Sequence, residues 1–213
     1  MAPQYDRVTV LDHPLIQHKL TLLRAKETSM KDFRQLLREL SILEGYEATK
    51  NLPLIDFKIE TPIQPMIGQI IEGTRITVVP ILRAGLGMLE GVLELLPSAR
   101  VGHLGMYRDP ETHEPVEYYA KLPEGIQDSR VYVIDPILAT GGSAEAAIAN
   151  LRARGVKDVT LLVIVAAPEG VERVLAADPD VHIYTCTIDD GLNENAYIVP
   201  GLGDAGDRIS GTI

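Results

Sequence analysis

The sequence predicts an α/β protein built on a mainly parallel, doubly wound sheet. Segments typical of strands alternate with segments typical of helices along most of its 213 residues. Several strand segments are continuous apolar runs, which is the pattern of a strand covered on both faces. Two of these runs pass directly into a loop of small residues and then into a helix. We expect one domain over residues 1–213, with N-terminal helices at 1–50, a β-arm, a flexible flap at 107–122 and a C-terminal binding segment at 189–213.

The composition is that of a globular protein with an acidic surface. Hydrophobic residues make up 46% of the chain and charged residues 23%, and the formal net charge is −10. This charge disfavours general binding to nucleic acid or to a membrane surface, because both favour a basic face. The single cysteine, Cys186, excludes an internal disulfide and a multi-cysteine metal site. No apolar run approaches the roughly 18 residues of a membrane span, and residues 1–7 lack an apolar signal core, so we expect a cytoplasmic protein.

Residues 1–50 are expected to be helical. Pro14 opens an amphipathic run that ends at Arg24, and Ser29 with Asp32 forms the pattern of a helix N-cap. These helices are expected to pack on the sheet or on a second subunit. The basic residues of these helices form either a solvated face or an effector site. These residues are His13, His18, Lys19, Arg24 and Lys26.

The next elements predict an arm and a first strand–loop–helix unit. Residues 56–60 alternate between polar and apolar, which predicts a half-exposed strand, and the prolines and glycine after them predict a hairpin or arm that serves dimer contacts. A core strand at 75–82 runs into the small-residue loop 83–87 and a helix at 88–96. Arg83 places a planar fork of donors at the end of that strand, which suits phosphate oxygens. The alternative is an ordinary exposed arginine.

A flap is expected after this unit. Strands at 101–107 and 116–122 flank a polar turn that contains two prolines. Such a turn is typical of a mobile flap that closes over a site and excludes water. Arg108 begins the turn, where it either reaches an anionic ligand on closure or forms a salt bridge within the turn.

The chain is organised around a second strand–loop–helix unit. An apolar strand at 131–134 is followed by Asp135, by the loop Thr-Gly-Gly-Ser at 140–143 and by a helix at 144–152. The glycines let backbone N–H groups turn towards an anion, the hydroxyls add donors, and the helix start adds partial positive charge. Asp135 would repel a phosphate, but it can accept hydrogen bonds from sugar hydroxyls. The unit predicts a ribose-phosphate site; the alternative is an ordinary turn with Ser143 as N-cap.

The alternation continues to the end of the sheet. A fully apolar strand is expected at 158–167, a helix at 168–177 and a strand at 181–188. Ligands of such sheets bind outside the carboxyl ends of the strands. The loops that carry the two arginines and the acid each follow a strand, so we expect them to converge at one edge of the sheet.

These motifs resemble those of the type I phosphoribosyltransferases, whose ribose-phosphate loop has an apolar strand, an acidic pair and Thr-Gly-Gly-Ser or Thr. Pro136 replaces the second acid, and Asp-Pro-x-x-Ala-Thr-Gly-Gly-Ser at 135–143 is similar to the form in the uracil phosphoribosyltransferase family. Three further segments resemble that family: Leu-Arg-Ala-Gly at 82–85, Tyr-Arg-Asp-Pro-Glu-Thr at 107–112 and Pro-Gly-Leu-Gly-Asp-Ala-Gly-Asp at 200–207. The likeness covers nearly the whole chain.

The resemblance implies a reaction of uracil with 5-phosphoribosyl 1-diphosphate that gives UMP and diphosphate. Mg²⁺ is the implied cofactor, carried by the diphosphate and not by a metal site of the protein. Catalytic roles are implied for Arg83, Arg108 and Asp135. The implied binding residues for the sugar diphosphate are Arg83, Arg108, Asp135, Pro136, Ile137, Leu138, Ala139, Thr140, Gly141, Gly142, Ser143 and Asp204, and those for uracil are Ile198, Gly203, Asp204 and Ala205.

Residues 197–207 are too rich in glycine and proline to favour a helix or a strand. A disordered tail is one interpretation, but the segment is apolar and is not of low complexity. The other is a rigid loop in which main-chain groups of Ile198, Gly203 and Ala205 complement the two carbonyls and the N–H of uracil. Cytosine would leave a buried group unpaired there, at a cost on the order of 1–3 kcal/mol.

Three alternatives and two partners complete the expectations. A purine or orotate enzyme of the same fold is disfavoured by Pro136, and orotate also by the absence of a cation in 197–207. A nucleotide-sensing, RNA-binding regulator is disfavoured by the net charge of −10. A generic dinucleotide-binding module is a weaker alternative still, because 85–87 lacks the third glycine of its fingerprint.

The arm and the N-terminal helices favour a homodimer or homotetramer. Some family members respond to GTP, so an allosteric GTP site is a further expectation.

Overall fold

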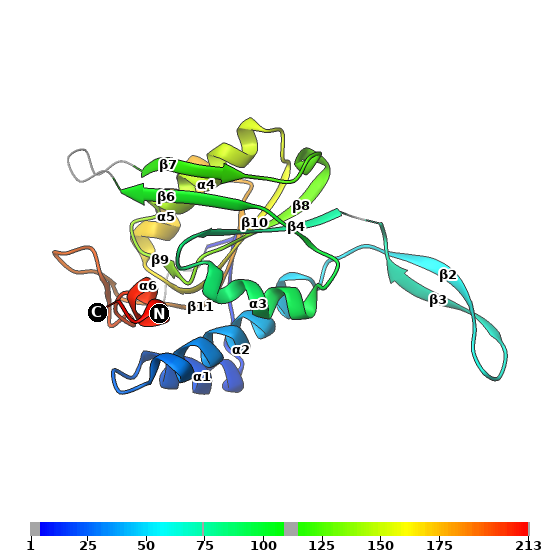
Figure 1. Ribbon diagram of the computed structural model, residues 1–213, viewed down its shortest axis with the longest axis horizontal. Coiled ribbons are helices and arrows are strands. Elements are labelled where there is room, and N and C mark those ends of the chain that lie inside the picture. The colour runs from blue at the N-terminus through cyan, green and yellow to red at the C-terminus, as the bar shows by residue number, and fades with distance from the viewer. Residues whose placement is uncertain (1–4, 74, 109–114, 213) are drawn as a thin grey trace.

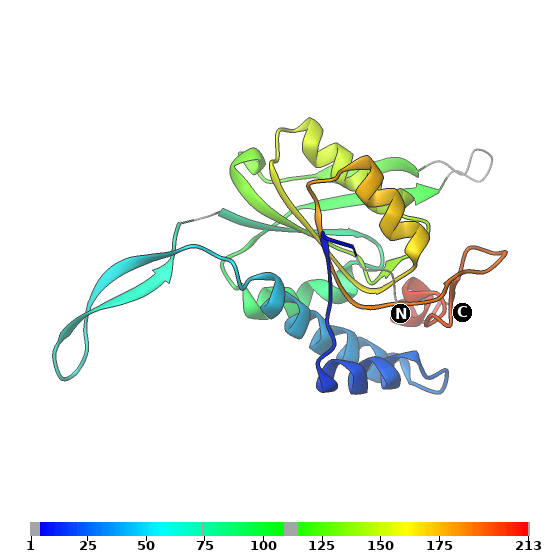
Figure 2. The same cartoon turned by 180° about the vertical axis from the view of Figure 1, so that it is seen from behind.

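A computed structural model shows a twisted central sheet with helices on both faces and a long hairpin that projects away from it (Figures 1 and 2). The structure describes residues 5–73, 75–108 and 115–212. No helix in this described part of the chain is both long and apolar enough to cross a membrane.

The central sheet is parallel except at one edge. Its main strands run in the order β1-β11-β10-β8-β4-β6-β7, and only β6 and β7 pair antiparallel along this path. This confirms the predicted fold class. The strands are β1 (Val8–Val10), β4 (Arg75–Leu82), β5 (Arg100–Val101), β6 (His103–Arg108), β7 (Pro115–Lys121), β8 (Ser129–Ile134), β9 (Ile137–Leu138), β10 (Asp158–Ala166) and β11 (His182–Ile188).

Two hydrophobic layers cover the two faces of the sheet. Alternate residues of β8 point into different layers: Tyr132 and Ile134 pack with the N-terminal helices, and Val131 and Val133 pack with the helices of the second half. This explains why the strand reads as a continuous apolar run. The helices are α1 (Pro14–Arg24), α2 (Met30–Ala48) and α3 (Leu86–Leu95) on one face, and α4 (Gly142–Ala153) and α5 (Pro168–Ala177) on the other, with a 3₁₀ turn at Ile126–Asp128.

The N-terminal region is only partly as predicted. The helices at Pro14 and after Ser29 are confirmed, and the Ser29 hydroxyl accepts the N–H of Asp32 at 3.1 Å. The expectation that all of residues 1–50 are helical was wrong, because residues 8–10 form β1 and pair with 183–185 of β11. Three residues carry too little periodicity to predict a strand, and this one exists through its pairing partner.

The arm is confirmed as an antiparallel hairpin of β2 (Leu54–Glu60) and β3 (Pro65–Ile71). It projects far from the sheet (Figure 1). The prediction of a half-exposed strand was wrong, since every residue of β2 is exposed. One face of the hairpin is wholly apolar, and its exposed side chains are Ile55, Phe57, Ile59, Met66 and Ile70.

The flap strands are confirmed as β6 and β7, which pair antiparallel. The turn between them, residues 109–114, lies outside the described residues.

The C-terminal segment contains regular structure, which corrects the expectation that 197–207 forms neither helix nor strand. Ile198–Val199 is β13, paired with β12 (Gly191–Leu192), and α6 spans Ala205–Ser210. The Asp204 side chain starts α6 by accepting the N–H of Asp207 at 2.9 Å. Asp is a strong N-cap, and this local signal outweighed the glycines around it.

Candidate active site

The loop between β8 and α4 forms a recess at the start of a helix. The recess has a volume of about 110 Å³ and is lined by Asp135, Ile137 and the backbone and side chains of residues 138–144. The N–H groups in the first turn of α4 have no acceptor within the helix, so they are available to an anion in front of it. Gly141, with φ +81°, is the N-cap of α4, so the alternative with Ser143 as N-cap was wrong.

Glycine contacts hold this loop in place. A Cβ on Gly141 would lie 2.8 Å from the carbonyl oxygen of Gly170 in α5, and a Cβ on Gly170 would lie 2.9 Å from that of Leu138. The Pro136 carbonyl accepts the N–H groups of Ile164 and Val165 at 3.1 Å each. The recess is therefore shaped by main-chain contacts to the next strand and helix.

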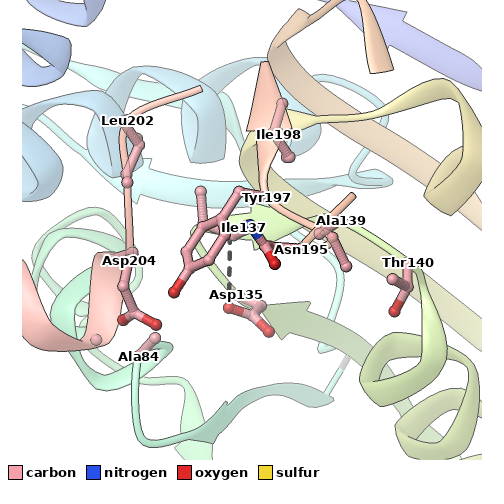
Figure 3. Close-up of a pocket in the computed structure, with 14 residues that line it drawn as sticks. Ala84, Asp135, Ile137, Ala139, Thr140, Asn195, Tyr197, Ile198, Leu202 and Asp204 are labelled. Carbon is pink, nitrogen blue, oxygen red and sulfur yellow. Dashed lines mark hydrogen bonds between the residues drawn. The ribbon is translucent and has the colours of Figure 1, made fainter. Parts of the chain in front are cut away.

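A larger cavity of about 360 Å³ (Figure 3) adjoins the recess, and the two share part of their lining. The shared residues are Asp135, Ile137, Ala139 and Thr140. The remaining lining comes from Ala84 after β4 and from the C-terminal segment, with Asn195, Ala196, Tyr197, Ile198, Leu202, Gly203, Asp204, Ala205 and Gly206. The carboxyl ends of the strands thus meet one composite site, as expected for a parallel sheet.

Two carboxylates line this cavity (Figure 3). Burial raises the pKa of Asp135 to about 7; the weak hydrogen bond from the N–H of Ile137, at 3.5 Å, lowers it, and the negative charge of Asp204 raises it further. Asp204 is exposed and caps α6. A site with two acids, one of them a partly buried carboxyl whose pKa lies near 7, suits a ligand that carries hydroxyl groups or a cation.

The structure brings the first strand–loop–helix unit to the same edge. A Cβ on Gly85 would lie 2.5 Å from the carbonyl oxygen of Ile134, so the loop after β4 packs against the end of β8. Arg83 is exposed and directly precedes Ala84, but it is not itself among the lining residues. Arg108 ends β6, and its side chain lies outside the described residues.

The four residues predicted for the base all line the cavity. The cross-strand bonds run from the Asp190 N–H to the Val199 carbonyl, at 3.0 Å, and from the Asn193 N–H to the Tyr197 carbonyl, at 2.9 Å. The pair Leu192–Ile198 falls between them, so the N–H and C=O of Ile198 point away from β12. These two main-chain groups are therefore not used in the ladder with β12.

Sequence reasoning missed several lining residues beside the predicted ones. Tyr197 is the largest, with 48% of its surface exposed, and it lies with Asn195 at the cavity (Figure 3). Ala196 has φ +61°, a left-handed conformation that is unusual for a residue with a Cβ. The feature of the sequence that could have identified Tyr197 as a lining residue is its position directly before a glycine-rich apolar loop.

The proposed basic effector face of residues 1–50 is largely engaged within the fold. Nδ1 of His13 accepts the N–H of Leu15 and caps α1, Lys19 pairs with Glu39, and Arg24 pairs with Asp189. This corrects the expectation of a solvated face or effector site for Lys19 and Arg24, whereas His13 stays exposed. Within the described ranges, no group of three or more His, Cys, Asp or Glu residues is placed to hold a metal ion.

Comparison with known proteins identifies the family. A family model described as uracil phosphoribosyltransferase matches residues 10–212. The chain is 57% identical over 207 residues to the uracil phosphoribosyltransferase of Alkaliphilus metalliredigens, covering 97% of this chain and 99% of that protein. It is 59% identical over 206 residues to that of Agathobacter rectalis, covering 97% of this chain and 99% of that protein. These relatives give no support to an RNA-binding regulator.

Solved structures agree at the level of the fold. A structure of the AQ2163 protein from Aquifex aeolicus is 41% identical with a TM-score of 0.88, covering 95% of this chain and 97% of that one. An adenine phosphoribosyl transferase from Trypanosoma brucei, at 14% identity and a TM-score of 0.61, covers 94% of this chain and 89% of that one and shares the fold alone. From the family model and these relatives, the chain belongs to the uracil phosphoribosyltransferase family.

Proposed function

We propose that the chain, as a single domain over residues 1–213, transfers the 5-phosphoribosyl group of 5-phosphoribosyl 1-diphosphate to N1 of uracil, giving UMP and diphosphate. The observation that carries this proposal is the junction of two compartments at Asp135 and Thr140. The smaller one, about 110 Å³ at a helix start, suits a phosphate, and the larger one, about 360 Å³, suits a nucleobase with its ribose.

The recess would bind the 5-phosphate of the sugar. The backbone N–H groups of residues 140–144 supply donors without a fixed full charge, and the helix start adds partial positive charge. The side chains of Thr140 and Ser143 supply hydroxyl donors in the same loop. The binding residues proposed for the sugar diphosphate are those from Asp135 to Ser143, together with Arg83, Arg108 and Asp204.

Asp135 is proposed to act on the ribose. Its carboxylate would accept hydrogen bonds from ribose hydroxyls and stabilise the positive charge that develops on the ring as the bond to diphosphate breaks. Only the ionised form can do this, so its raised pKa sets a pH below which the reaction slows. Arg83 and Arg108 would neutralise the departing diphosphate, each from a loop that follows a strand.

The two carboxylates also fit Mg²⁺ that arrives with the substrate. Mg²⁺ is usually held by one or two carboxylates together with substrate phosphates, and Asp135 and Asp204 line the cavity as such a pair. When bound, Mg²⁺ neutralises charge on the diphosphate. Asp204 would keep its place through its role as the N-cap of α6.

The base would be read by main-chain groups of the C-terminal segment. We place uracil against Ile198, Gly203, Asp204 and Ala205, where amide and carbonyl groups match its two carbonyls and its N–H. Tyr197 would cover an apolar face of the ring.

Homo-oligomer formation is proposed from the arm. Its apolar face has five large side chains that are each 42% to 48% exposed. An isolated two-stranded hairpin is only marginally stable in water, and an exposed apolar patch of this kind is typical of a protein–protein contact. A second copy of the chain is the proposed partner. A GTP effector and a cytoplasmic location stay predictions.

The proposal is tested with radiolabelled uracil, 5-phosphoribosyl 1-diphosphate and Mg²⁺, with cytosine and hypoxanthine as control bases. UMP is the expected product, and the two controls should give none. Isothermal titration of uracil with and without the sugar diphosphate should show how the two sites are coupled. Turnover of hypoxanthine in place of uracil, or specific binding of pyrimidine-operon RNA in a gel shift without any turnover, would overturn the proposal.

A further inference from the structure

An ion pair between a partly buried arginine and a buried aspartate holds the base-binding loop, residues 198–205. Arg24, the last residue of α1, donates from Nη1 to Oδ2 of Asp189 at 2.7 Å and from Nη2 to Oδ1 at 2.6 Å. The Asp189 side chain is 4% exposed. A bidentate pair with this burial is costly to desolvate unless further hydrogen bonds complete it.

Those further hydrogen bonds go to Gly201. Its N–H donates to Oδ2 of Asp189 at 2.8 Å, and its carbonyl accepts from Nη1 of Arg24 at 2.6 Å. Gly201 has φ +60°, and a Cβ there would overlap the carbonyl of Ile198. The ion pair therefore hydrogen-bonds both main-chain polar groups of Gly201. This residue lies in the turn between Ile198 and Leu202, and those two residues line the cavity.

A third charged side chain holds the other end of the turn. Arg208 of α6 donates to the carbonyls of Leu202 at 2.9 Å, Arg24 at 3.3 Å and Ala25 at 2.7 Å. Its guanidinium also lies 4.4 Å from the centre of the Phe33 ring. Arg208 thereby ties the base-binding loop to the same end of α1 that carries the ion pair.

These three charged side chains support residues of the cavity wall but do not line the cavity themselves. Arg24, Asp189 and Arg208 are absent from the lining of the 360 Å³ cavity, whereas the residues they hold belong to it or adjoin it. A loop that recognises a ligand through main-chain groups cannot adjust by changing a side-chain rotamer. Its affinity and specificity depend on a fixed backbone, and a shift of about 1 Å can cost two orders of magnitude.

We propose that Arg24 and Asp189 are positioning residues for the nucleobase, which hold Gly201 so that the main-chain groups from Ile198 to Ala205 face the base. This inference rests on the proposed function of the same site. The recess for the 5-phosphate is lined by Asp135 and residues 137–144. The hydrogen bonds between Arg24, Asp189 and Gly201, here called the clamp, go to none of these residues. Loss of the clamp should therefore weaken recognition of the base and leave binding of the sugar diphosphate intact.

The test compares Asp189→Asn with a matched control, Asp178→Asn. Asp178 forms a similar bidentate pair with Arg152, at 2.5 and 3.0 Å, but on the α4–α5 side and away from both compartments. Asp189→Asn should raise KM for uracil at least about tenfold and narrow the discrimination against cytosine, with KM for the sugar diphosphate within about twofold. Asp178→Asn should lower the melting temperature and leave both KM values unchanged.

Arg24→Lys keeps the test decisive if Asp189→Asn does not fold. Lysine retains the charge but cannot make the fork of bonds to Asp189 and Gly201, so KM for uracil should rise by a smaller factor. Equal changes in both KM values, a change in kcat alone, or no change in either variant would overturn the clamp. Absence of uracil turnover in the unmodified protein would instead overturn the proposed function, so the two failures are distinguishable.

Discussion

The phosphate loop and the base-binding loop meet at one cavity, but different forces hold them in shape. The phosphate loop, 135–144, belongs to one continuous strand–loop–helix unit and is fixed by glycines that touch neighbouring main chain. The base-binding loop, 198–205, is fixed by charged side chains, of which Arg24 lies 165 residues before its partner Asp189. We therefore expect function of the phosphate loop to be impaired by a side chain added at one of its glycines. Function of the base-binding loop should be impaired when a charged side chain that holds it is neutralised.

A substitution at Asp135, which lines both the recess and the larger cavity, should have the largest effect on catalysis. Asp135→Asn removes the charge that stabilises the ribosyl cation but keeps the size of the side chain, so kcat should fall by at least about 10²-fold with the fold intact. Rate measurements at saturating substrates, with circular dichroism as a control for folding, check this. Unchanged turnover in the variant would remove Asp135 from the mechanism.

The same residue gives a pH dependence with a defined sign. Burial raises the pKa of Asp135 to about 7, so the active carboxylate is lost as the pH falls below that value. We expect kcat/KM for the sugar diphosphate to decline on the acid side of about pH 7, and this decline should be absent in Asp135→Asn. Asp204→Asn removes a negative charge that raises the same pKa, so the inflection should move to lower pH.

Added volume tests the phosphate loop. Gly141→Ala introduces a Cβ at φ +81° and 2.8 Å from the carbonyl oxygen of Gly170, which must push the loop off α5. We expect kcat/KM for the sugar diphosphate to fall by about 10²-fold.

Gly155→Ala is the matched control, since its φ is +84° but its Cβ would meet only the side chain of Gln127, at 3.4 Å. That variant should lose about 1–2 kcal/mol of stability and keep its kinetics. Equal kinetic losses in both variants would show that the loss comes from backbone strain in general, and not from contact of the phosphate loop with α5.

A buried acid in α2 offers a variant that should change stability without affecting either loop. Glu44 of α2 is fully buried, and neither carboxylate oxygen makes a hydrogen bond of ordinary geometry within the described chain. Burial raises its pKa well above the usual range, so above about pH 4.5 the unfolded chain ionises while the folded one stays neutral. Wild-type stability should then fall as the pH rises towards the folded pKa.

Glu44→Leu removes this penalty. We expect a gain of about 1–3 kcal/mol in the free energy of unfolding at pH 7, a smaller gain at pH 5, and unchanged KM values for both substrates. Urea denaturation at the two pH values measures the gain. Glu44→Gln is the control: it should lose the pH dependence but still bury an amide, so it should gain less. A loss of stability in the leucine variant would contradict this account.

Short-range chemistry explains which parts of the fold were predictable. The boundaries of β4, the start of α5 at Pro168 and the cap at Ser29 follow from apolar runs, a proline and a hydroxyl, all of which act within a few residues. The strand β1 was missed because three residues become a strand only by pairing with β11. The helix α6 was missed because glycine and proline content was weighed above the Asp204 cap.

The sequence by itself determined the phosphate loop, because glycine positions, hydroxyl donors and an acid at a strand end constrain the local backbone whatever surrounds them. Only the tertiary structure decided that Arg24 pairs with Asp189 and that both grip Gly201. The chain has 20 lysine and arginine and 30 acidic side chains, and local sequence does not select a partner among them. Packing of α1 against the end of β11 makes that choice, because it buries Asp189 and brings the partly buried Arg24 within hydrogen-bonding distance of it.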